Sequence, residues 1–233
     1  MLRVRGLHAH YGRAHILYGI DLDVGEGEVL VLVGRNGAGK STTMKALIGL
    51  VPPTSGEITF QNNQTAGLPP YAIARLGLGY VPEERRIFTD LTVAENLEVG
   101  RQPPRGNRPA WTPERLFALF PNLANMGARP GGRMSGGEQQ MLTIARTLMG
   151  NPSLVLLDEP SEGLSPLIVE QMSAAILALK AEGVSILLAE QNLHFSSLLA
   201  DRAAVIETGR IVWSGPMATL MHDDAVRSAY LAV

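Results

Sequence analysis

The stretch Gly34-Arg35-Asn36-Gly37-Ala38-Gly39-Lys40-Ser41 decides the fold of this 233-residue chain. It matches the pattern G-x-x-x-x-G-K-[ST], in which glycines let the backbone bend so that its N–H groups point at phosphate oxygens. An apolar run over residues 28–33 precedes it and predicts a buried strand, and helical spacing follows over residues 40–50, where two prolines are expected to stop the helix. A strand, a glycine-rich turn and a helix in this order predict a phosphate-binding loop.

Two side chains of this loop suit a nucleoside triphosphate. Lys40 supplies a positive charge to the β- and γ-phosphates, and Ser41 supplies a hydroxyl to Mg²⁺. The alternative is a plain glycine turn between a strand and a helix. The residues that we expect to contact the nucleotide here are Gly34, Asn36, Gly37, Ala38, Gly39, Lys40, Ser41 and Thr42.

A second apolar run ends in two carboxylates. The segment Leu154-Val155-Leu156-Leu157-Asp158-Glu159 predicts a strand buried on both faces, with its acidic residues at the carboxyl end, where ligands of α/β proteins bind. We expect Asp158 to hold Mg²⁺ through its water shell and Glu159 to polarise the attacking water. Alone, this pattern also fits a solvated acidic strand end; together with the phosphate loop it favours an ATP-hydrolysing site.

The elements around these motifs predict an α/β fold. Ser165 and Pro166 open a helix that ends at Gly183, and an apolar run over residues 184–188 predicts another buried strand. Strand, helix and strand in this order imply parallel crossovers and a P-loop NTPase core with a parallel sheet. Short alternating segments in the first sixty residues predict an antiparallel β flap beside this core.

The middle of the chain differs from both ends. Thr92 opens a capping box, and helices are expected over residues 113–120 and 138–149, with no strand pattern from about 85 to 149. We therefore expect one domain over residues 1–233. Its α/β core spans about 1–84 and 150–233, and an α-helical subdomain is inserted over about 85–149.

Composition excludes several classes of protein. Hydrophobic residues make up 45% of the chain, which rules out wholesale disorder, and a net charge of −2 argues against a general nucleic-acid binder. The chain has no cysteine, so disulfides and cysteine-based zinc sites are excluded. No secretory signal is visible, and the apolar runs are far shorter than the roughly 20 residues that span a bilayer. Any membrane role is expected to be peripheral.

A third motif resembles a known family. Met134-Ser135-Gly136-Gly137-Glu138-Gln139-Gln140 is a serine N-cap with two glycines before a helix, which makes a second anion site. It is similar to the signature of ABC ATPases, which usually reads Leu-Ser-Gly-Gly-Gln. The resemblance implies a head-to-tail dimer in which Ser135, Gly136 and Gly137 close on ATP held by the partner. It also implies that Tyr11 stacks on the adenine.

The chain departs from the usual family pattern at three places, and two of them point to one subgroup of the family. Glu83 stands where most ABC ATPases have Gln, and Gln191 stands at the switch histidine; with Glu159, these are the expected catalytic residues. The dimer-contact loop Ser161-Glu162-Gly163-Leu164 lacks its usual terminal Asp. Glu83, Gln191 and the tail Ala225-Val226-Arg227-Ser228-Ala229-Tyr230-Leu231 resemble the ATPases of branched-chain and other nonpolar amino-acid importers.

The resemblance implies a subunit at the cytoplasmic face of a membrane that hydrolyses ATP with Mg²⁺. Its partners would be a second ABC ATPase subunit, in a homo- or heterodimer, two membrane permease subunits and an extracytoplasmic solute-binding protein. One alternative is a regulatory half-site that binds ATP but hydrolyses little, which the departures at Glu83 and Gln191 favour. The others are an importer ATPase for urea or short amides, and a soluble ABC ATPase that acts on ribosomes or DNA.

Overall fold

The computed structural model describes residues 1–233 except 106–108, 224, 226 and 229–233. The tail over 225–231 therefore lies largely outside the described residues. Six strands form a central sheet in the order β10-β9-β3-β8-β7-β6, parallel from β9 to β6. Their bounds are β3 Val29–Val33, β6 Leu78–Val81, β7 Leu154–Asp158, β8 Ser185–Glu190, β9 Arg202–Glu207 and β10 Arg210–Pro216. The expected α/β fold with a parallel sheet is confirmed, and β10 adds an antiparallel edge.

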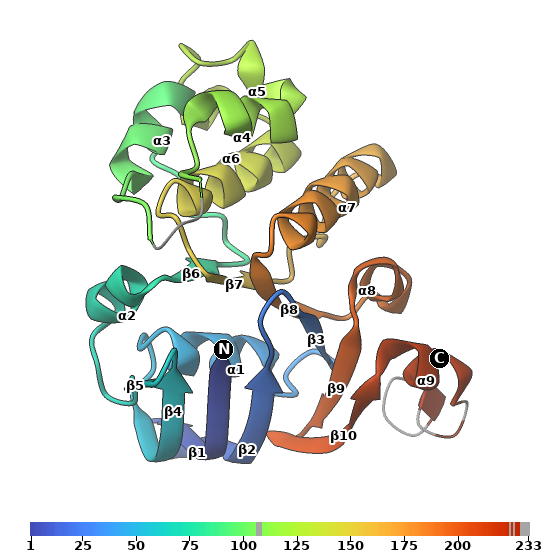
Figure 1. The fold of residues 1–233 in the computed structure, drawn as a ribbon. Helices are drawn as coiled ribbons and strands as arrows, with labels where there is room; N and C mark the ends of the chain where they lie inside the picture. Colours follow the sequence, from blue (N-terminus) through green and yellow to red (C-terminus); the bar gives the residue numbers. More distant parts are fainter. Residues whose placement is uncertain (106–108, 224, 226, 229–233) are drawn as a thin grey trace.

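A second, antiparallel sheet has the order β2-β1-β4-β5 and lies beside the central one (Figure 1). Its strands are β1 Leu2–Tyr11, β2 Ala14–Val24, β4 Pro53–Phe60 and β5 Asn63–Gln64. The expected N-terminal flap is thus present. Its strands are longer than the short segments expected from sequence, because pairing continues past irregularities such as the register shift between Val4 and Leu7.

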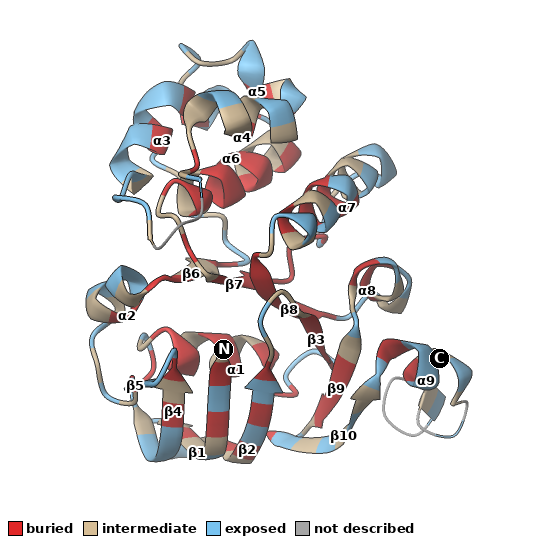
Figure 2. Cartoon of the chain, viewed as in Figure 1, coloured by how far each residue is buried: buried red, intermediate tan, exposed pale blue. Residues whose placement is uncertain are grey.

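The central strand β3 is buried along its whole length (Figure 2). It lies between two hydrophobic cores. Val29, Val31 and Val33 pack on the side of helices α6 (Gly136–Leu148) and α7 (Pro166–Ala181). Leu30 and Leu32 pack on the opposite side, with α1 (Lys40–Leu47) and the antiparallel sheet. A strand that is buried on both faces reads as one continuous apolar run, which is why this segment was recognisable in the sequence.

Helix α1 ends before the prolines that were expected to stop it. Gly49 takes a left-handed conformation with φ of 80°, and Leu50 N–H donates back to the Lys45 carbonyl. A Cβ at Gly49 would lie 2.5 Å from the Leu68 carbonyl oxygen, so only glycine fits this close approach. The prediction that Pro52 and Pro53 end the helix is therefore wrong, because Gly49 does so earlier.

Helices gather above one side of the central sheet (Figure 1). Both expected N-caps here are present: Thr92 and Ser135 each form a capping box with the glutamate three residues later. The helices are α3 Val93–Gly100, α4 Pro113–Leu119, α5 Pro121–Ala124, the 3₁₀ turn η1 Gly131–Arg133 and α6. The remaining helices are α2 Pro70–Leu76, α7, α8 Leu193–Leu199 and α9 Met217–His222. The division at about residues 85 and 149 stays a prediction.

Candidate functional site

The glycine-rich loop between β3 and α1 surrounds a buried lysine. Gly39 precedes α1 with a φ of 114°, a conformation that favours glycine. The Lys40 ammonium donates to the carbonyls of Gly34 (2.7 Å) and Arg35 (3.1 Å). It also forms an ion pair with Glu159 Oε1 at 3.0 Å, and the two side chains are only 3% and 9% exposed. The lysine is thus held in the loop by groups that a phosphate would replace.

A pocket of about 380 Å³ opens beside this lysine. It brings together the phosphate loop and three acidic residues from two segments: Glu83 after β6, and Glu159 and Glu162 in the loop after β7. Glu83 and Glu159 were predicted for the site, whereas Glu162 was expected only in the dimer-contact loop. The lining residues are Ile16, Asn36, Gly37, Gly39, Lys40, Ser41, Thr42, Glu83, Glu159 and Glu162. Burial, with repulsion from Glu159 and Glu83, raises the pKa of Glu162.

Asp158 lies at the end of β7 and is held at both carboxyl oxygens. Ser41 Oγ donates to Oδ1 at 3.0 Å, and the Tyr80 hydroxyl donates to Oδ2 at 3.1 Å. Burial raises the pKa of Asp158 to about 6, although both hydrogen bonds act in the opposite direction. Burial, together with the Asp158 charge, also raises the pKa of Tyr80, so its phenol stays a donor. Sequence reasoning missed Tyr80, because its contact depends on strand pairing.

Glu159 has a backbone conformation that is uncommon for a residue with a side chain. Its φ is 47°, in the left-handed region, and its N–H donates to the Ala189 carbonyl at 2.9 Å. Such residues are strained, and they cluster at functional sites. The structure thus places strain at the residue that directly follows the candidate metal ligand.

The buried carboxylate of Glu190 links two loops of the site. Its Oε1 accepts from the Ser161 N–H at 3.1 Å, and its Oε2 accepts from the N–H groups of Gln191 (3.1 Å) and Asn192 (3.3 Å). Burial is the largest influence and raises the pKa of Glu190, although these bonds act in the opposite direction. Glu190 was not predicted, and its position at the end of an apolar strand was the signal available in the sequence.

Three further predicted residues, Tyr11, Gln191 and Ser135, do not line this pocket in the single chain. Tyr11 is 48% exposed at the end of β1 and does not line the pocket. Gln191 is exposed after β8, and it too is outside the lining. Ser135 caps α6, where Gly136 leaves room for the Arg85 guanidinium, 2.6 Å from where a Cβ would lie. Their roles toward a nucleotide stay predictions.

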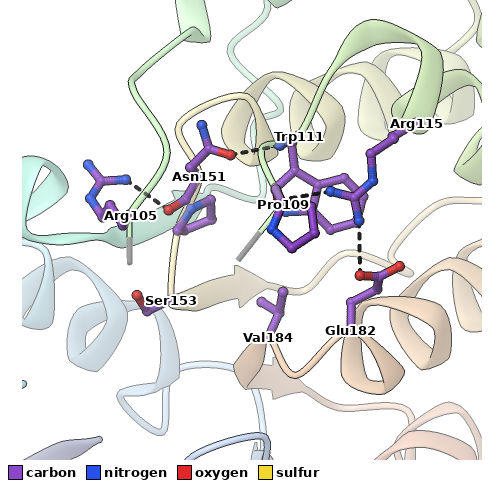
Figure 3. A pocket seen from close by; sticks show the side chains of 9 residues that line it. Arg105, Pro109, Trp111, Arg115, Asn151, Ser153, Glu182 and Val184 are labelled. Carbon is purple, nitrogen blue, oxygen red and sulfur yellow. Dashed lines mark hydrogen bonds and ion pairs between the residues drawn. The ribbon is translucent and has the colours of Figure 1, made fainter. Parts of the chain in front are cut away.

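A second pocket lies where the helical region meets the core (Figure 3). Its volume is about 30 Å³, room for about one water molecule. Asn151 Oδ1 accepts from the backbone N–H of Trp111 at 2.7 Å. Arg115 pairs with Glu182 at 2.9 Å, and its guanidinium lies over the Trp111 ring. Arg105 donates to the Asn151 carbonyl in the loop after α6 and to two carbonyls in the last turn of α2. These contacts join segments and leave no room for a nucleotide.

A parallel strand, a glycine-rich loop with a buried lysine, and a strand-end aspartate beside a serine define a P-loop nucleotide-binding protein. The family model described as ABC transporter matches residues 17–162. The chain belongs to the ABC transporter family and is an ATP-binding, ATP-hydrolysing subunit of such a transporter. No helix in the described part of the chain is long and apolar enough to cross a membrane.

Curated relatives match over almost their whole length. The chain is 42% identical over 231 residues to the high-affinity branched-chain amino acid transport ATP-binding protein BraG of Pseudomonas aeruginosa, covering 99% of both chains. It is 33% identical to the probable branched-chain amino acid transport ATP-binding protein LivF of Archaeoglobus fulgidus, covering 96% of this chain and 95% of that one. It is 34% identical to the lipopolysaccharide export system ATP-binding protein LptB of Acidithiobacillus ferridurans, covering 99% and 96%.

Solved structures share the fold. A nucleotide-free ATP-binding cassette from an ABC transporter superposes with a TM-score of 0.82 at 26% identity, covering 97% of this chain and 96% of that one. An ATP-binding subunit of an ABC transporter gives a TM-score of 0.81 at 27% identity, covering 100% and 96%. The predicted family, its P-loop fold and its ATPase activity are therefore confirmed.

Proposed function

We propose that this subunit powers the import of branched-chain or other nonpolar amino acids. The observation that carries the proposal is the 42% identity to BraG over 99% of both chains. In this proposal two membrane permease subunits form the path, an extracytoplasmic solute-binding protein delivers the amino acid, and the subunit works at the cytoplasmic face of the membrane. Glu83 and Gln191, which match the importer subgroup by resemblance, agree with this assignment.

The pocket supports a direct route for hydrolysis. The phosphate loop binds the triphosphate, and Lys40 moves from Glu159 to the β- and γ-phosphates, which leaves the Glu159 carboxylate free. Water then attacks the γ-phosphorus while Glu159 accepts its proton, the bond from the γ-phosphorus to the bridging oxygen breaks, and ADP leaves. Glu83 lines the same pocket and would orient the water or the γ-phosphate.

The donor set beside Lys40 fits Mg²⁺. This ion prefers oxygen ligands, and a hydroxyl (Ser41) and a carboxylate (Asp158) lie 3.0 Å apart next to the phosphate loop. When bound, Mg²⁺ neutralises charge that develops on the phosphate oxygens. Ser41 and Asp158 would hold it, with Asp158 acting through water.

The predicted residues that do not line the pocket fit a dimer. Ser135 and the two glycines after it form the capped N-terminus of α6, which suits an anion. None of these three residues lines the pocket that contains the phosphate loop of the same chain. A second ABC ATPase subunit, packed head to tail, would supply that phosphate. Gln191 would reach the γ-phosphate in the same closed state, and Tyr11 would stack on the adenine.

An apolar groove of about 600 Å³ suits a cytoplasmic segment of a permease. Four large side chains in it are exposed to solvent: Leu50 (47%), Tyr71 (65%), Phe88 (46%) and Val99 (55%). Arg75 and Arg146 add positive charge, and none of the lining residues that the structure describes is acidic. Burial lowers the pKa of Arg146, and its Nη1 has no hydrogen-bond partner. An amphipathic helix that carries a carboxylate would complete this groove.

The proposal is tested by transport. The subunit is purified together with the permease proteins encoded by genes beside its own, and the complex is reconstituted in proteoliposomes with the neighbouring binding protein outside. Uptake of radiolabelled leucine, urea and acetamide is measured with and without internal ATP. The proposal predicts uptake of leucine that depends on ATP and on the binding protein. Uptake of urea or acetamide without uptake of leucine would favour the amide importer. If no substrate is taken up and the neighbouring genes encode lipopolysaccharide export proteins, the function named for LptB is favoured.

A regulatory half-site with little hydrolysis is the second candidate, and the same vesicles test it. The ion pair of Lys40 with Glu159 and the hydrogen bond of Ser41 to Asp158 argue against it, because they bring the three groups proposed for hydrolysis together beside the phosphate loop. If the subunit binds ATP but the assembled dimer hydrolyses it only through its partner subunit, the half-site function stands.

A further inference from the structure

Tyr80 contacts two different sites: its ring lines the apolar groove, and its hydroxyl reaches Asp158 in the proposed Mg²⁺ site. The residue lies on β6 and lines the apolar groove, and it is absent from the lining of the nucleotide pocket. Its hydroxyl nevertheless donates to Asp158 Oδ2 at 3.1 Å. The proposed hydrolysis assigns no role to this contact.

Strand pairing explains how a groove residue reaches the aspartate. Strands β6 and β7 are parallel, and Tyr80 pairs with Leu156, two residues before Asp158. The long tyrosine side chain leans along the strand and so spans those two residues, which a shorter side chain would not do. The ring is partly buried and packs against the core on the α1 side of the sheet, which restricts where the hydroxyl can lie.

The hydroxyl completes the fixation of the carboxylate. Ser41 holds Oδ1 from one element and Tyr80 holds Oδ2 from another, so rotation of the carboxylate breaks at least one hydrogen bond. Ser41 is itself an expected metal ligand, so its hydroxyl changes partner when the ion binds. Tyr80 lies outside the pocket and is the donor that stays on Asp158.

We propose that Tyr80 is a positioning residue that orients Asp158 for Mg²⁺ from outside the nucleotide pocket. The inference rests on the proposed metal site at Ser41 and Asp158. Partners that orient a metal ligand from behind typically change metal affinity by about 10- to 100-fold when they are removed. A side chain of the groove thus sets the affinity of the nucleotide site for its metal.

Tyr80→Phe separates the two parts of this side chain. The ring still fills its place in the core, so the fold is retained, and only the hydrogen bond to Asp158 is lost. Tyr18→Phe is the matched control, because Tyr18 also donates a single hydrogen bond, to the His15 carbonyl at 3.0 Å, but in the antiparallel sheet. Thermal unfolding of both variants checks that each is folded.

The measurement is the affinity for a fluorescent ATP analogue, first with excess EDTA and then with saturating Mg²⁺, in the full-length chain. In EDTA, Tyr80→Phe should bind the analogue as wild type does. The gain in affinity on adding Mg²⁺ should be smaller than that of wild type by about tenfold or more. Tyr18→Phe should show the wild-type gain. A titration of the nucleotide complex with Mn²⁺, followed by its paramagnetic resonance, gives a second readout that does not depend on turnover.

Two results would overturn the inference. An unchanged gain in Tyr80→Phe shows that the hydroxyl does not act on the metal site, and an equal loss in EDTA and in Mg²⁺ shows a general structural effect. Failure of the proposed metal site looks different, since wild type itself would then gain nothing from Mg²⁺; failure of the import proposal would appear only in the transport assay and would leave these affinities unchanged.

Discussion

Replacing Glu159 with glutamine should have two opposite effects, because the residue is paired with Lys40 when no nucleotide is bound. The ion pair of 3.0 Å is almost fully buried. A hydrogen bond to a charged group contributes about 1.5–3 kcal/mol, so Glu159→Gln should lower the free energy of unfolding of the nucleotide-free chain by about that amount. The two carbonyl acceptors of Lys40 remain and keep the loss within this range.

ATP binding should become tighter for the same reason. The triphosphate must separate Lys40 from Glu159 in wild type, and in the variant this cost is smaller by about 1.5–3 kcal/mol, which corresponds to an affinity about 10- to 100-fold higher. Hydrolysis should nevertheless fall by about 10²- to 10⁴-fold, because the amide does not accept the proton of water.

The assays are urea unfolding without nucleotide, titration with a fluorescent ATP analogue in EDTA, and phosphate release in the assembled transporter. Glu83→Gln is the control, because it removes a carboxylate from the same pocket and Glu83 has no hydrogen bond or ion pair to Lys40 or Glu159 in the described structure. Its gain in affinity measures the general effect of charge and should be less than tenfold. The reasoning is refuted if Glu159→Gln matches wild type in both stability and affinity, or if its gain in affinity is no larger than that of Glu83→Gln.

Three further predictions follow from the site. Gln191→Ala should lower hydrolysis by about tenfold or more. Gln191→His should keep activity but add a titration between about pH 6 and 7, which a pH–rate profile of the assembled complex would reveal. If Gln191→Ala hydrolyses ATP like wild type, the side chain has only a structural role at the end of the strand. In mixed dimers, Ser135→Ala should impair hydrolysis at the partner's phosphate loop, and a defect confined to its own loop would contradict the head-to-tail dimer. Burial raises the pKa of Asp158 to about 6, and Mg²⁺ requires the ionised form, so the Mg²⁺ concentration for half-maximal hydrolysis should be constant above about pH 7. It should rise about tenfold per unit well below about pH 6, and a flat profile would show that Asp158 is not a ligand.

The phosphate loop and the acidic strand were predictable because their chemistry is local in sequence. Residues 34–41 contain the bend, the ammonium and the hydroxyl together, and Asp158 is placed by the apolar run before it. The bounds of β3 and β7 lie within one residue of those predicted from the sequence, because strands that are buried on both faces are continuous apolar runs.

Contacts that depend on strand order or on close packing were not predictable. The bond from Tyr80 to Asp158 requires β6 to pair with β7 across a long insertion, which one sequence does not reveal. The early end of α1 at Gly49 comes from the approach of the Leu68 carbonyl, a tertiary contact. The left-handed conformation of Glu159 likewise has no signal in its residue type, because glycine is the residue usually expected there.

Titration of Lys40→Ala with a fluorescent ATP analogue tests most directly whether this loop binds the triphosphate. Loss of a buried charged hydrogen-bond donor to a ligand typically costs about 2–5 kcal/mol, so affinity should fall by about thirtyfold or more. The double variant Lys40→Ala, Glu159→Gln removes the unpaired carboxylate and guards against misfolding of the single variant. The account predicts that both variants lose tight binding while both stay folded, and wild-type affinity in either folded variant would contradict it.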